Sequence, residues 1–373
     1  MLTVLSVFGT RPEAIKMAPV VRELAKHPGR CRSVVAVTGQ HRQMLDQVLE
    51  LFRITPDHDL DVMRPDQTLS GLTATLFTEV DRLMDGVRPD WVLAQGDTTT
   101  VMVVALVAFY RRVRFGHVEA GLRTGDRQHP FPEEINRRVA DLVADLYFAP
   151  TGRAREALLR EGCPEGSVLV TGNTVIDALH EVAARPYDWD AGPLSALPRG
   201  GRLVLVTAHR RESFGEPFRE LCLAIRELAE TLRPRGVHFV YPVHLNPNVR
   251  RPVGEVLSGL PNVSLIEPLD YLSLVQVMKR SALILTDSGG VQEEAPGLGV
   301  PVLVMRDTTE RPEGVDAGVV RLVGTRRERI VSEVTRLLND PAAHAAMATG
   351  ANPYGDGRAA ARIVDALLER SHP

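Results

Sequence analysis

Several features that would mark a specialised class of protein are scarce or missing in this sequence of 373 residues. Its three cysteines, Cys31, Cys163 and Cys222, form no C-x-x-C pair, which argues against a disulfide framework and against a zinc knuckle. Its longest apolar run, residues 101–109, is about half as long as a membrane-spanning helix. The net charge of −3 provides no general attraction to nucleic acid or to an anionic membrane. We therefore expect a cytoplasmic globular protein that binds neither.

The sequence also lacks the short motifs of common cofactor sites. It contains no G-x-G-x-x-G fingerprint for a dinucleotide and no G-x-x-x-x-G-K-[ST] loop for a nucleoside triphosphate. Its 11 histidines and three cysteines show no spacing typical of a metal site, and no G-x-S-x-G nucleophile elbow occurs. We expect the protein to use no cofactor and no metal ion.

What the sequence does contain is a regular alternation of short apolar runs and longer helical patterns. The runs are rich in valine and leucine and occur at residues 2–8, 34–37, 91–94, 114–118, 146–148 and 168–170, and again at 203–207, 238–241, 263–266, 282–286, 300–305 and 319–323. Continuous apolar strands between helices predict parallel sheets that are covered on both faces. The first run begins at Leu2 without the basic segment or cleavage site of a signal peptide, so we interpret it as the first strand.

The densest cluster of prolines and glycines separates the two series, between Arg185 and Arg202. The expected fold class is α/β, with two Rossmann-like doubly wound domains that face each other across a cleft. We expect an N-terminal domain at residues 1–185, a linker at 186–202 and a C-terminal nucleotide-binding domain at 203–354. The helical pattern over about 355–373 predicts a terminal helix.

Two cations follow the first expected strand, at the edge where open α/β sheets bind ligands. They are Arg11 and Lys16, and Lys16 is one of only three lysines among the 44 basic residues. Cations near a helix N-terminus are mildly unfavourable unless an anion bridges them, so both residues are candidate anion ligands. The alternative interpretation is that both charges are exposed to solvent.

Three carboxylates follow later strands of the same series or lie in the loop beyond them. They are Asp97, Glu119 and Glu133. Carboxylates that meet in a closed cleft can act as separate general base and general acid. Each also has a structural alternative, because Asp97 could cap a helix and Glu133 and Glu134 could occupy the first turn of one.

The second series offers two histidines and a glycine turn at the ends of strands. His209 and His244 each follow an expected strand, although a lone histidine is more often structural than catalytic. Residues 288–290, Ser-Gly-Gly, stand at the start of an expected helix, where backbone amides and the serine hydroxyl could hold a phosphate. Arg311 could reach the same phosphates.

Eight motifs in register resemble those of the bacterial non-hydrolysing UDP-N-acetylglucosamine (UDP-GlcNAc) 2-epimerases, over residues 2 to about 325. They are F-G-T-R-P-E-A-I-K-M-A-P (8–19), T-G-Q-H-R-Q-M-L (38–45), Q-G-D-T (95–98), H-V-E-A-G-L-R-T (117–124), P-F-P-E-E-I-N-R (130–137), T-A-H-R-R-E (207–212), D-S-G-G-V-Q-E-E (287–294) and T-E-R-P-E (309–313). The resemblance implies a fold like that of GT-B glycosyltransferases, with the terminal helix returning to the first domain. It further implies a homodimer that converts UDP-GlcNAc reversibly to UDP-N-acetylmannosamine (UDP-ManNAc), a precursor for cell-surface polysaccharide.

The resemblance also implies roles for individual positions. Catalytic roles fall on Asp97, Glu119, Glu133 and His209. UDP-binding roles fall on Arg11, Lys16, His244, Ser288, Gly289, Gly290, Glu294 and Arg311. Some members bind a second, activating UDP-GlcNAc beside the active site, a pattern matched by Gln40, Gln43, Glu133 and Arg210. Where such members often carry a basic residue, this chain has Pro65-Asp66, and an acid there would repel a phosphate.

The reaction that the resemblance implies is anti elimination of UDP to 2-acetamidoglucal, followed by re-addition. Three alternatives remain at this point. A hydrolysing relative would release ManNAc and UDP, a metal-independent glycosyltransferase of the same fold would need an acceptor, and an inactive nucleotide-sugar sensor would have lost the acids. The sensor is disfavoured because all the expected acids are present.

Overall fold

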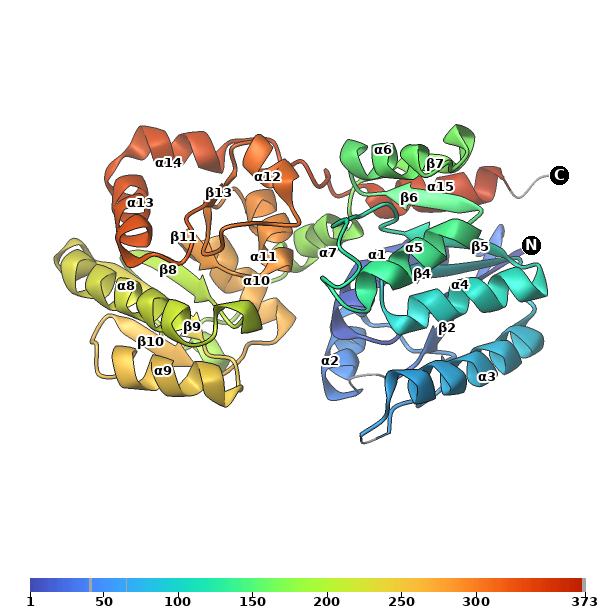
Figure 1. The fold of residues 1–373 in the computed structure, drawn as a ribbon, viewed down its shortest axis with the longest axis horizontal. Coiled ribbons are helices and arrows are strands. Elements are labelled where there is room, and N and C mark those ends of the chain that lie inside the picture. The colour runs from blue at the N-terminus through green and yellow to red at the C-terminus, as the bar shows by residue number, and fades with distance from the viewer. Residues whose placement is uncertain (40–41, 65, 371–373) are drawn as a thin grey trace. The chain divides into compact units, whose positions relative to one another are not determined.

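The computed structural model describes residues 1–39, 42–64 and 66–370 (Figure 1). Internal contacts divide the chain into two units, one made of Met1–Ala178 with Tyr354–Pro373 and the other of Leu179–Pro353. Each unit contains a parallel sheet with helices, which confirms the α/β expectation. None of the described helices has the length and apolarity that crossing a membrane would require.

The first unit is built on one sheet whose strands, over the described residues, run in the order β3-β2-β1-β4-β5-β6-β7. The strands are β1 (Leu2–Phe8), β2 (Cys31–Val37), β3 (His58–Asp59), β4 (Trp91–Gln95), β5 (Arg114–Val118), β6 (Leu146–Ala149) and β7 (Val168–Val170). The helices are α1 (Arg11–Ala25), α2 (Arg42–Phe52), α3 (Leu69–Val87), α4 (Thr99–Arg111), α5 (Glu133–Val143), α6 (Gly152–Arg160), the first half of α7 (Thr174–Ala183) and the terminal α15 (Ala359–Glu369). The order reverses between β1 and β4, so the loops after these two strands flank the place where such sheets bind ligands.

Local sequence accounts for these elements. Every residue of β4 is buried, as expected for a parallel strand covered on both faces. Helix α1 begins with a capping box, in which Thr10 Oγ1 accepts the Glu13 N–H and the Glu13 carboxylate accepts the Thr10 N–H. Strand β3 was not expected, because its two exposed residues carry no apolar pattern.

The second unit contains a six-stranded sheet over its described residues, in the order β10-β9-β8-β11-β12-β13. The strands are β8 (Arg202–Thr207), β9 (Val237–Pro242), β10 (Val263–Ile266), β11 (Ser281–Thr286), β12 (Val302–Val304) and β13 (Val320–Leu322). The helices are α8 (Glu216–Leu232), α9 (Pro247–Leu257), α10 (Tyr271–Arg280), α11 (Gly289–Glu294), α12 (Pro312–Asp316), α13 (Arg327–Asn339) and α14 (Pro341–Ala348). Here the order reverses between β8 and β11. The loops after these strands contain His209 and Asp287.

The terminal helix belongs to the first unit, in keeping with the expected return. It packs against α1, and both carboxylate oxygens of Asp177 accept backbone N–H groups at its start, from Ala359 at 3.1 Å and Ala360 at 2.9 Å. Burial raises the pKa of Asp177, although these hydrogen bonds lower it. A side chain from α7 thus caps a helix that is remote in sequence.

Internal contacts place the boundary between the units at a different position from the one that the proline and glycine pattern predicts. The second unit begins at Leu179, within α7, and it includes the whole segment 186–202 that was expected to be a linker. Within this segment the Tyr187 hydroxyl lies 3.1 Å from Ser273 Oγ, and Leu194 and Leu197 are buried. Prolines and glycines interrupt helices and strands, but they do not prevent a segment from packing on the unit that follows it.

Candidate functional site

The loops after β1 and β4 are joined by one buried carboxylate, Glu13. Its Oε2 accepts the Gly9 N–H at 2.9 Å and the Thr10 N–H at 2.7 Å, while its Oε1 accepts the Thr98 hydroxyl at 2.6 Å. Burial raises the pKa of Glu13, and these hydrogen bonds lower it in part. Glu13 therefore orders the turn that leads into Arg11, the half-buried first residue of α1. Glu13 lies in the first of the eight motifs, but no role was expected for it.

Glu119 is held at the carboxyl end of β5 in an uncommon backbone conformation. Its φ is +66°, in the left-handed region that costs energy for most residues other than glycine. Its Oε2 accepts hydrogen bonds from Lys16 Nζ at 2.5 Å and from Asn173 Nδ2 at 2.9 Å. Both donors orient the carboxylate. Lys16, expected to bind UDP, thus lies against an acid, and Asn173 had not been singled out in the sequence.

Asp97 follows β4, the strand next to β5 in the sheet. Its carboxylate pairs with the Arg137 guanidinium, and its carbonyl oxygen accepts a hydrogen bond from Asn136 Nδ2 at 3.0 Å. The alternative in which Asp97 caps a helix is wrong, because the N-cap of α4 is Thr98. The aspartate is therefore held by α5 and not by the helix that follows it.

The two adjacent glutamates at the start of α5 differ in environment. Glu134 is fully buried, and its carboxylate accepts the N–H groups of Thr124 at 3.1 Å and Gly125 at 3.3 Å. Both glutamates occupy the first turn of α5, which confirms the structural interpretation for each. Only Glu134 is also tied to neighbouring backbone, whereas Glu133 is partly exposed.

In the second unit, Asp287 organises the loop that carries His209. Asp287 is buried, and its Oδ2 accepts the N–H groups of His209 at 2.6 Å and Arg210 at 2.7 Å. The His209 Nδ1 lies 3.7 Å from the other oxygen, Oδ1. The ring of His209 stacks on that of His244 with centroids 5.2 Å apart. Burial and the neighbouring His209 lower the pKa of His244.

The glycine turn follows β11 directly, next to this histidine pair. The Ser288 N–H donates to Thr286 Oγ1 at 2.9 Å. Glu294, at the other end of α11, accepts a hydrogen bond from the buried Tyr271 hydroxyl at 2.7 Å. The Arg311 guanidinium pairs with the Glu293 carboxylate. Four of the residues expected to contact UDP, Ser288, Gly289, Gly290 and Glu294, therefore lie on α11 or at its start, and Arg311 pairs with a residue of the same helix.

Residues of the expected activating site are only partly described. Gln40 lies outside the described residues, and the side chain of Gln43, in the first turn of α2, is not described either. Arg210 lies 3.8 Å from Glu310. Burial alone would raise the pKa of Glu310, but Arg306 lowers it to about 2. Asp66 is exposed, with a φ of +54°.

No group of three or more histidine, cysteine, aspartate or glutamate side chains within residues 1–39, 42–64 and 66–370 has the arrangement of a metal site. The polar side chains of both sheet edges instead form pairs of carboxylates with cations or with backbone N–H groups. Such an arrangement suits proton transfer and the binding of an anion.

Comparison with known proteins identifies the family. A family model described as UDP-N-acetylglucosamine 2-epimerase matches residues 22–368. The chain is 52% identical over 372 residues to the UDP-N-acetylglucosamine 2-epimerase of Escherichia coli (strain K12), covering 98% of each protein. A crystal structure of UDP-GlcNAc 2-epimerase from Neisseria meningitidis bound to UDP-GlcNAc is 46% identical, with a TM-score of 0.89, covering 99% of this chain and 100% of that one. The glycotransferase of kitacinnamycin, 15% identical with a TM-score of 0.64 over 100% of this chain and 99% of that one, shares the fold alone. This chain belongs to the UDP-N-acetylglucosamine 2-epimerase family.

Proposed function

We propose that the protein interconverts UDP-GlcNAc and UDP-ManNAc by inverting C2 of the sugar. The C2 hydrogen is not next to a carbonyl, so it becomes acidic only when the C1–O bond to UDP loosens. In the first half-reaction a carboxylate takes the C2 proton, a C1=C2 double bond forms, and the electron pair of the C1–O bond leaves with UDP. Protonation of C2 on the opposite face and return of UDP to C1 complete the reaction.

The observation that carries this proposal is the oriented carboxylate of Glu119. A proton acceptor must be within reach of C2 and held in place, and the hydrogen bonds from Lys16 and Asn173 fix the carboxylate of Glu119. Two faces of C2 require two proton carriers, and Asp97 on the adjacent strand end is the second candidate. The accessible Glu133 completes the proposed set of acids.

We assign UDP-binding roles in each unit separately. In the first unit they fall on Arg11 and on Lys16, which also donates to Glu119. In the second unit, donors for the diphosphate are the Ser288-Gly-Gly290 turn and His209 or Arg311, and His244 and Glu294 are assigned to UDP without a contact to the diphosphate. Hydrogen-bond donors that face developing negative charge are typically worth about 3 to 4 kcal/mol each in the transition state. The backbone contacts of Asp287 support this assignment, because they fix the loop that carries His209.

The test is incubation of the enzyme with UDP-GlcNAc alone in D2O, followed by proton NMR. We expect UDP-ManNAc with deuterium at C2, because the proton removed from one face is exchanged with solvent before another is added. Free ManNAc with UDP would contradict this and support the hydrolysing alternative. Unchanged substrate would leave the glycosyltransferase and sensor alternatives.

A second UDP-GlcNAc site at Gln40, Gln43, Glu133 and Arg210 remains part of the proposal. Two features argue against strong activation at that site. Asp66 brings a negative charge, and Arg210 lies close to the carboxylates of Glu310 and Glu212, at 3.8 and 4.0 Å. A cytoplasmic location is also proposed, since the three cysteines are free thiols.

We also propose that the protein forms a homodimer through α4 and α5. These helices pack against each other and carry exposed apolar side chains, namely Phe109, Tyr110, Ile135 and Leu142. Leu142 is 82% exposed, and it lines a pocket of about 390 Å³ together with Phe109. Contiguous exposed apolar side chains are typical of interfaces.

A Leu142→Glu variant should therefore elute as a monomer, with half the mass of the parent protein in light scattering. A charge in the centre of an apolar interface is costly because it must be desolvated without a partner. The matched control is Val170→Glu, at an exposed valine on β7. A monomeric parent, or a dimer in both variants, would contradict this surface as the interface.

A further inference from the structure

One histidine near the carboxyl end of β5, an interior strand of the first sheet, has no role in the proposed mechanism. His117, in β5, is completely buried and stacks on Phe115 with ring centroids 5.9 Å apart. Both of its ring nitrogens make short contacts. Nδ1 lies 2.6 Å from Asp141 Oδ1, and Nε2 lies 2.7 Å from the carbonyl oxygen of Gly96.

These contacts define the protonation state of the ring. A carbonyl oxygen can only accept, so Nε2 of His117 must donate to Gly96. The other oxygen of Asp141 accepts hydrogen bonds from the Gly121 N–H at 3.2 Å and from Arg123 Nη2 at 2.7 Å, which favours an ionised carboxylate. An ionised carboxylate also only accepts, so Nδ1 must donate as well. A histidine that donates from both nitrogens is an imidazolium.

The charges around the ring agree with this state. Asp141 faces His117 from α5, and Arg123 faces Asp141 from the loop after β5. Burial alone would lower the pKa of His117 and Arg123 also lowers it, but Asp141 and the two hydrogen bonds raise it above its ordinary value. Burial alone would raise the pKa of Asp141, but His117 and Arg123 hold it below its ordinary value.

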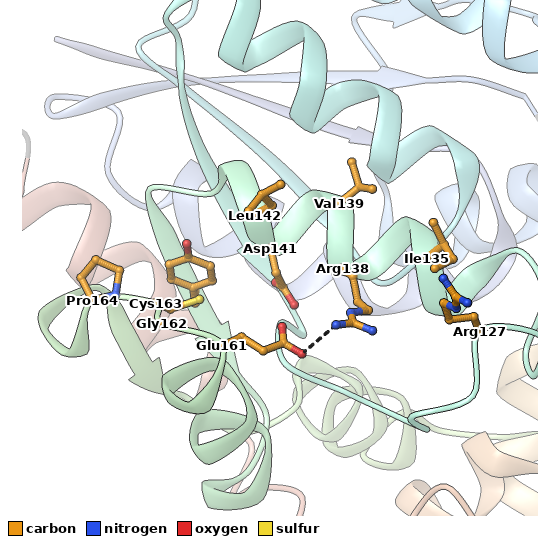
Figure 2. Close-up of a pocket in the computed structure, with 11 residues that line it drawn as sticks. Arg127, Ile135, Arg138, Val139, Asp141, Leu142, Glu161, Gly162, Cys163 and Pro164 are labelled. Carbon is orange, nitrogen blue, oxygen red and sulfur yellow. Dashed lines mark ion pairs between the residues drawn. The ribbon is translucent and has the colours of Figure 1, made fainter.

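The outer end of this network borders a pocket of about 670 Å³. Figure 2 shows Asp141 and Glu161 on its wall, with the ion pair between Glu161 and Arg138. Glu161 also pairs with Arg123 at 2.7 Å. Positive and negative side chains therefore alternate along the network, in the order His117, Asp141, Arg123, Glu161 and Arg138. Each charge lies next to one of the opposite sign.

The network holds the two loops to which the proposed catalytic acids belong. Gly96 immediately precedes Asp97, and Gly121 follows Glu119 by two residues. Gly121 has a φ of +87°, and a Cβ there would lie 2.4 Å from the Ala154 carbonyl oxygen, so the loop passes close to the start of α6. His117 and Asp141 thus link the loop after β4 to the loop after β5.

We propose that His117 is a positioning residue, held as an imidazolium, that fixes the turn of Asp97 relative to the loop of Glu119. This inference rests on the proposed function, because it assigns catalytic roles to these two acids. His117 itself is buried and acts through its contact with the backbone of Gly96. A displacement of about 1 Å in a reacting group can cost about 100-fold in rate, so loss of this link is expected to lower kcat.

The protonation state is tested by NMR on the full chain labelled with ¹⁵N-histidine, independently of activity. We expect two protonated ring nitrogens on His117 near pH 7, above the ordinary histidine pKa of about 6.5, assigned by the signals that vanish in His117→Gln. In Asp141→Asn, the new amide can donate to Nδ1 while Nε2 still donates to Gly96. One ring N–H signal should then be lost. A nitrogen without a proton in the parent protein, or an ordinary histidine titration, would overturn the inference.

The positioning role is tested by kinetics. His117→Gln should lower kcat by about 10- to 100-fold with little change in KM, because the loops and not the substrate contacts are disturbed. The share of substrate released as 2-acetamidoglucal and UDP should rise, since re-addition needs both acids in place. Asp141→Asn, which preserves the hydrogen bonds to the ring, should keep most of the kcat of the parent protein.

The matched control is His238→Gln, because His238 is a half-buried histidine on β9 that contacts Ser264 Oγ at 2.8 Å. Its kcat should equal that of the parent protein. A folded His117→Gln with normal kcat and no added release of the intermediate would overturn the positioning role. If the parent protein fails to incorporate deuterium at C2, that result contradicts the proposed function. The NMR test of the protonation state of His117 does not depend on activity, so it remains valid in that case.

Discussion

A Glu119→Gln variant should lose about 100-fold or more of the kcat for epimerisation, since positioned general bases typically contribute about 10²- to 10⁴-fold. Glutamine has nearly the same shape as glutamate. Its carbonyl oxygen can still accept the hydrogen bonds that Lys16 Nζ and Asn173 Nδ2 donate to Glu119. It cannot take up a proton from C2. The loss should therefore fall on the chemical step and not on folding.

The left-handed backbone of Glu119 makes this a sharp test. A non-glycine residue persists at a φ of +66° only when the surrounding structure holds it there, and such conformations concentrate at functional sites. Glutamine tolerates this conformation about as well as glutamate does, so the backbone is not an added variable. A lower rate can then be traced to the missing negative charge.

The measurement is the initial rate of UDP-ManNAc formation together with the rate of deuterium uptake at C2. Both rates should fall in Glu119→Gln. The control is Glu165→Gln, an exposed glutamate of the same unit that pairs with Arg155, and its rates should match those of the parent protein. Normal deuterium uptake by Glu119→Gln would remove Glu119 from proton transfer and leave Asp97 and Glu133 as the remaining acids.

Asp141→Ala should destabilise the first unit by about 3 to 5 kcal/mol, the usual cost of removing one partner from a buried ion pair. His117 and Asp141 are both buried, and Arg123 is largely so. The variant leaves the imidazolium and the guanidinium without their common carboxylate. It also leaves the Gly121 N–H without its acceptor.

The loss can be measured by urea unfolding with Trp91 fluorescence, in a Trp189→Phe background. Trp91 lies in β4 of the first unit and Trp189 in the second, so the remaining signal reports on the first unit. The matched control is Asp81→Ala, which removes an exposed carboxylate paired with Arg111. Its effect should be much smaller, because exposed ion pairs contribute little. Equal urea midpoints for Asp141→Ala and Asp81→Ala would mean that the buried network contributes no more to stability than an exposed ion pair.

The same network predicts how this stability depends on pH. The pKa of Asp141 is lower in the folded chain than in the unfolded chain. Its contribution to stability is therefore complete above its pKa in the unfolded chain, and it is lost as pH falls through its pKa in the folded chain. The pKa of His117 is higher in the folded chain. Its contribution to stability is therefore complete below its pKa in the unfolded chain, and it is lost as pH rises through its pKa in the folded chain. The difference between parent and Asp141→Ala should thus be largest between about pH 3.9 and 6.5.

The fold class and the family could be predicted from the sequence because both depend on local pattern. The apolar run at residues 2–8 coincides with β1, and that at 114–118 coincides with β5. Buried parallel strands need continuous apolar segments, so the pattern identifies them directly. Motifs such as Gln95-Gly-Asp97 and His117-Val-Glu119 are contiguous, so they too could be recognised without a structure. Their positions after strands followed from the same alternation.

The tertiary structure alone decided which polar residues hold the proposed site. Asn173 reaches Glu119 across 54 positions of sequence, and Asp287 reaches the His209 loop across 78. Neither contact has a local pattern, because it depends on which strands are neighbours and on which loops meet at one edge of a sheet. The same holds for the choice between the adjacent glutamates at the start of α5.

The sequence by itself determined that the chain forms two sets of parallel strands covered by helices, since continuous apolar strands that alternate with helical segments allow few other arrangements. Long-range contacts, which no local pattern encodes, decided the boundary between the units and the partners of the carboxylates. His117 illustrates the difference. Its motif was evident in the sequence, but its charge depends on Asp141, a residue 24 positions away on another element. A buried group takes its protonation state from the partners that the fold brings to it.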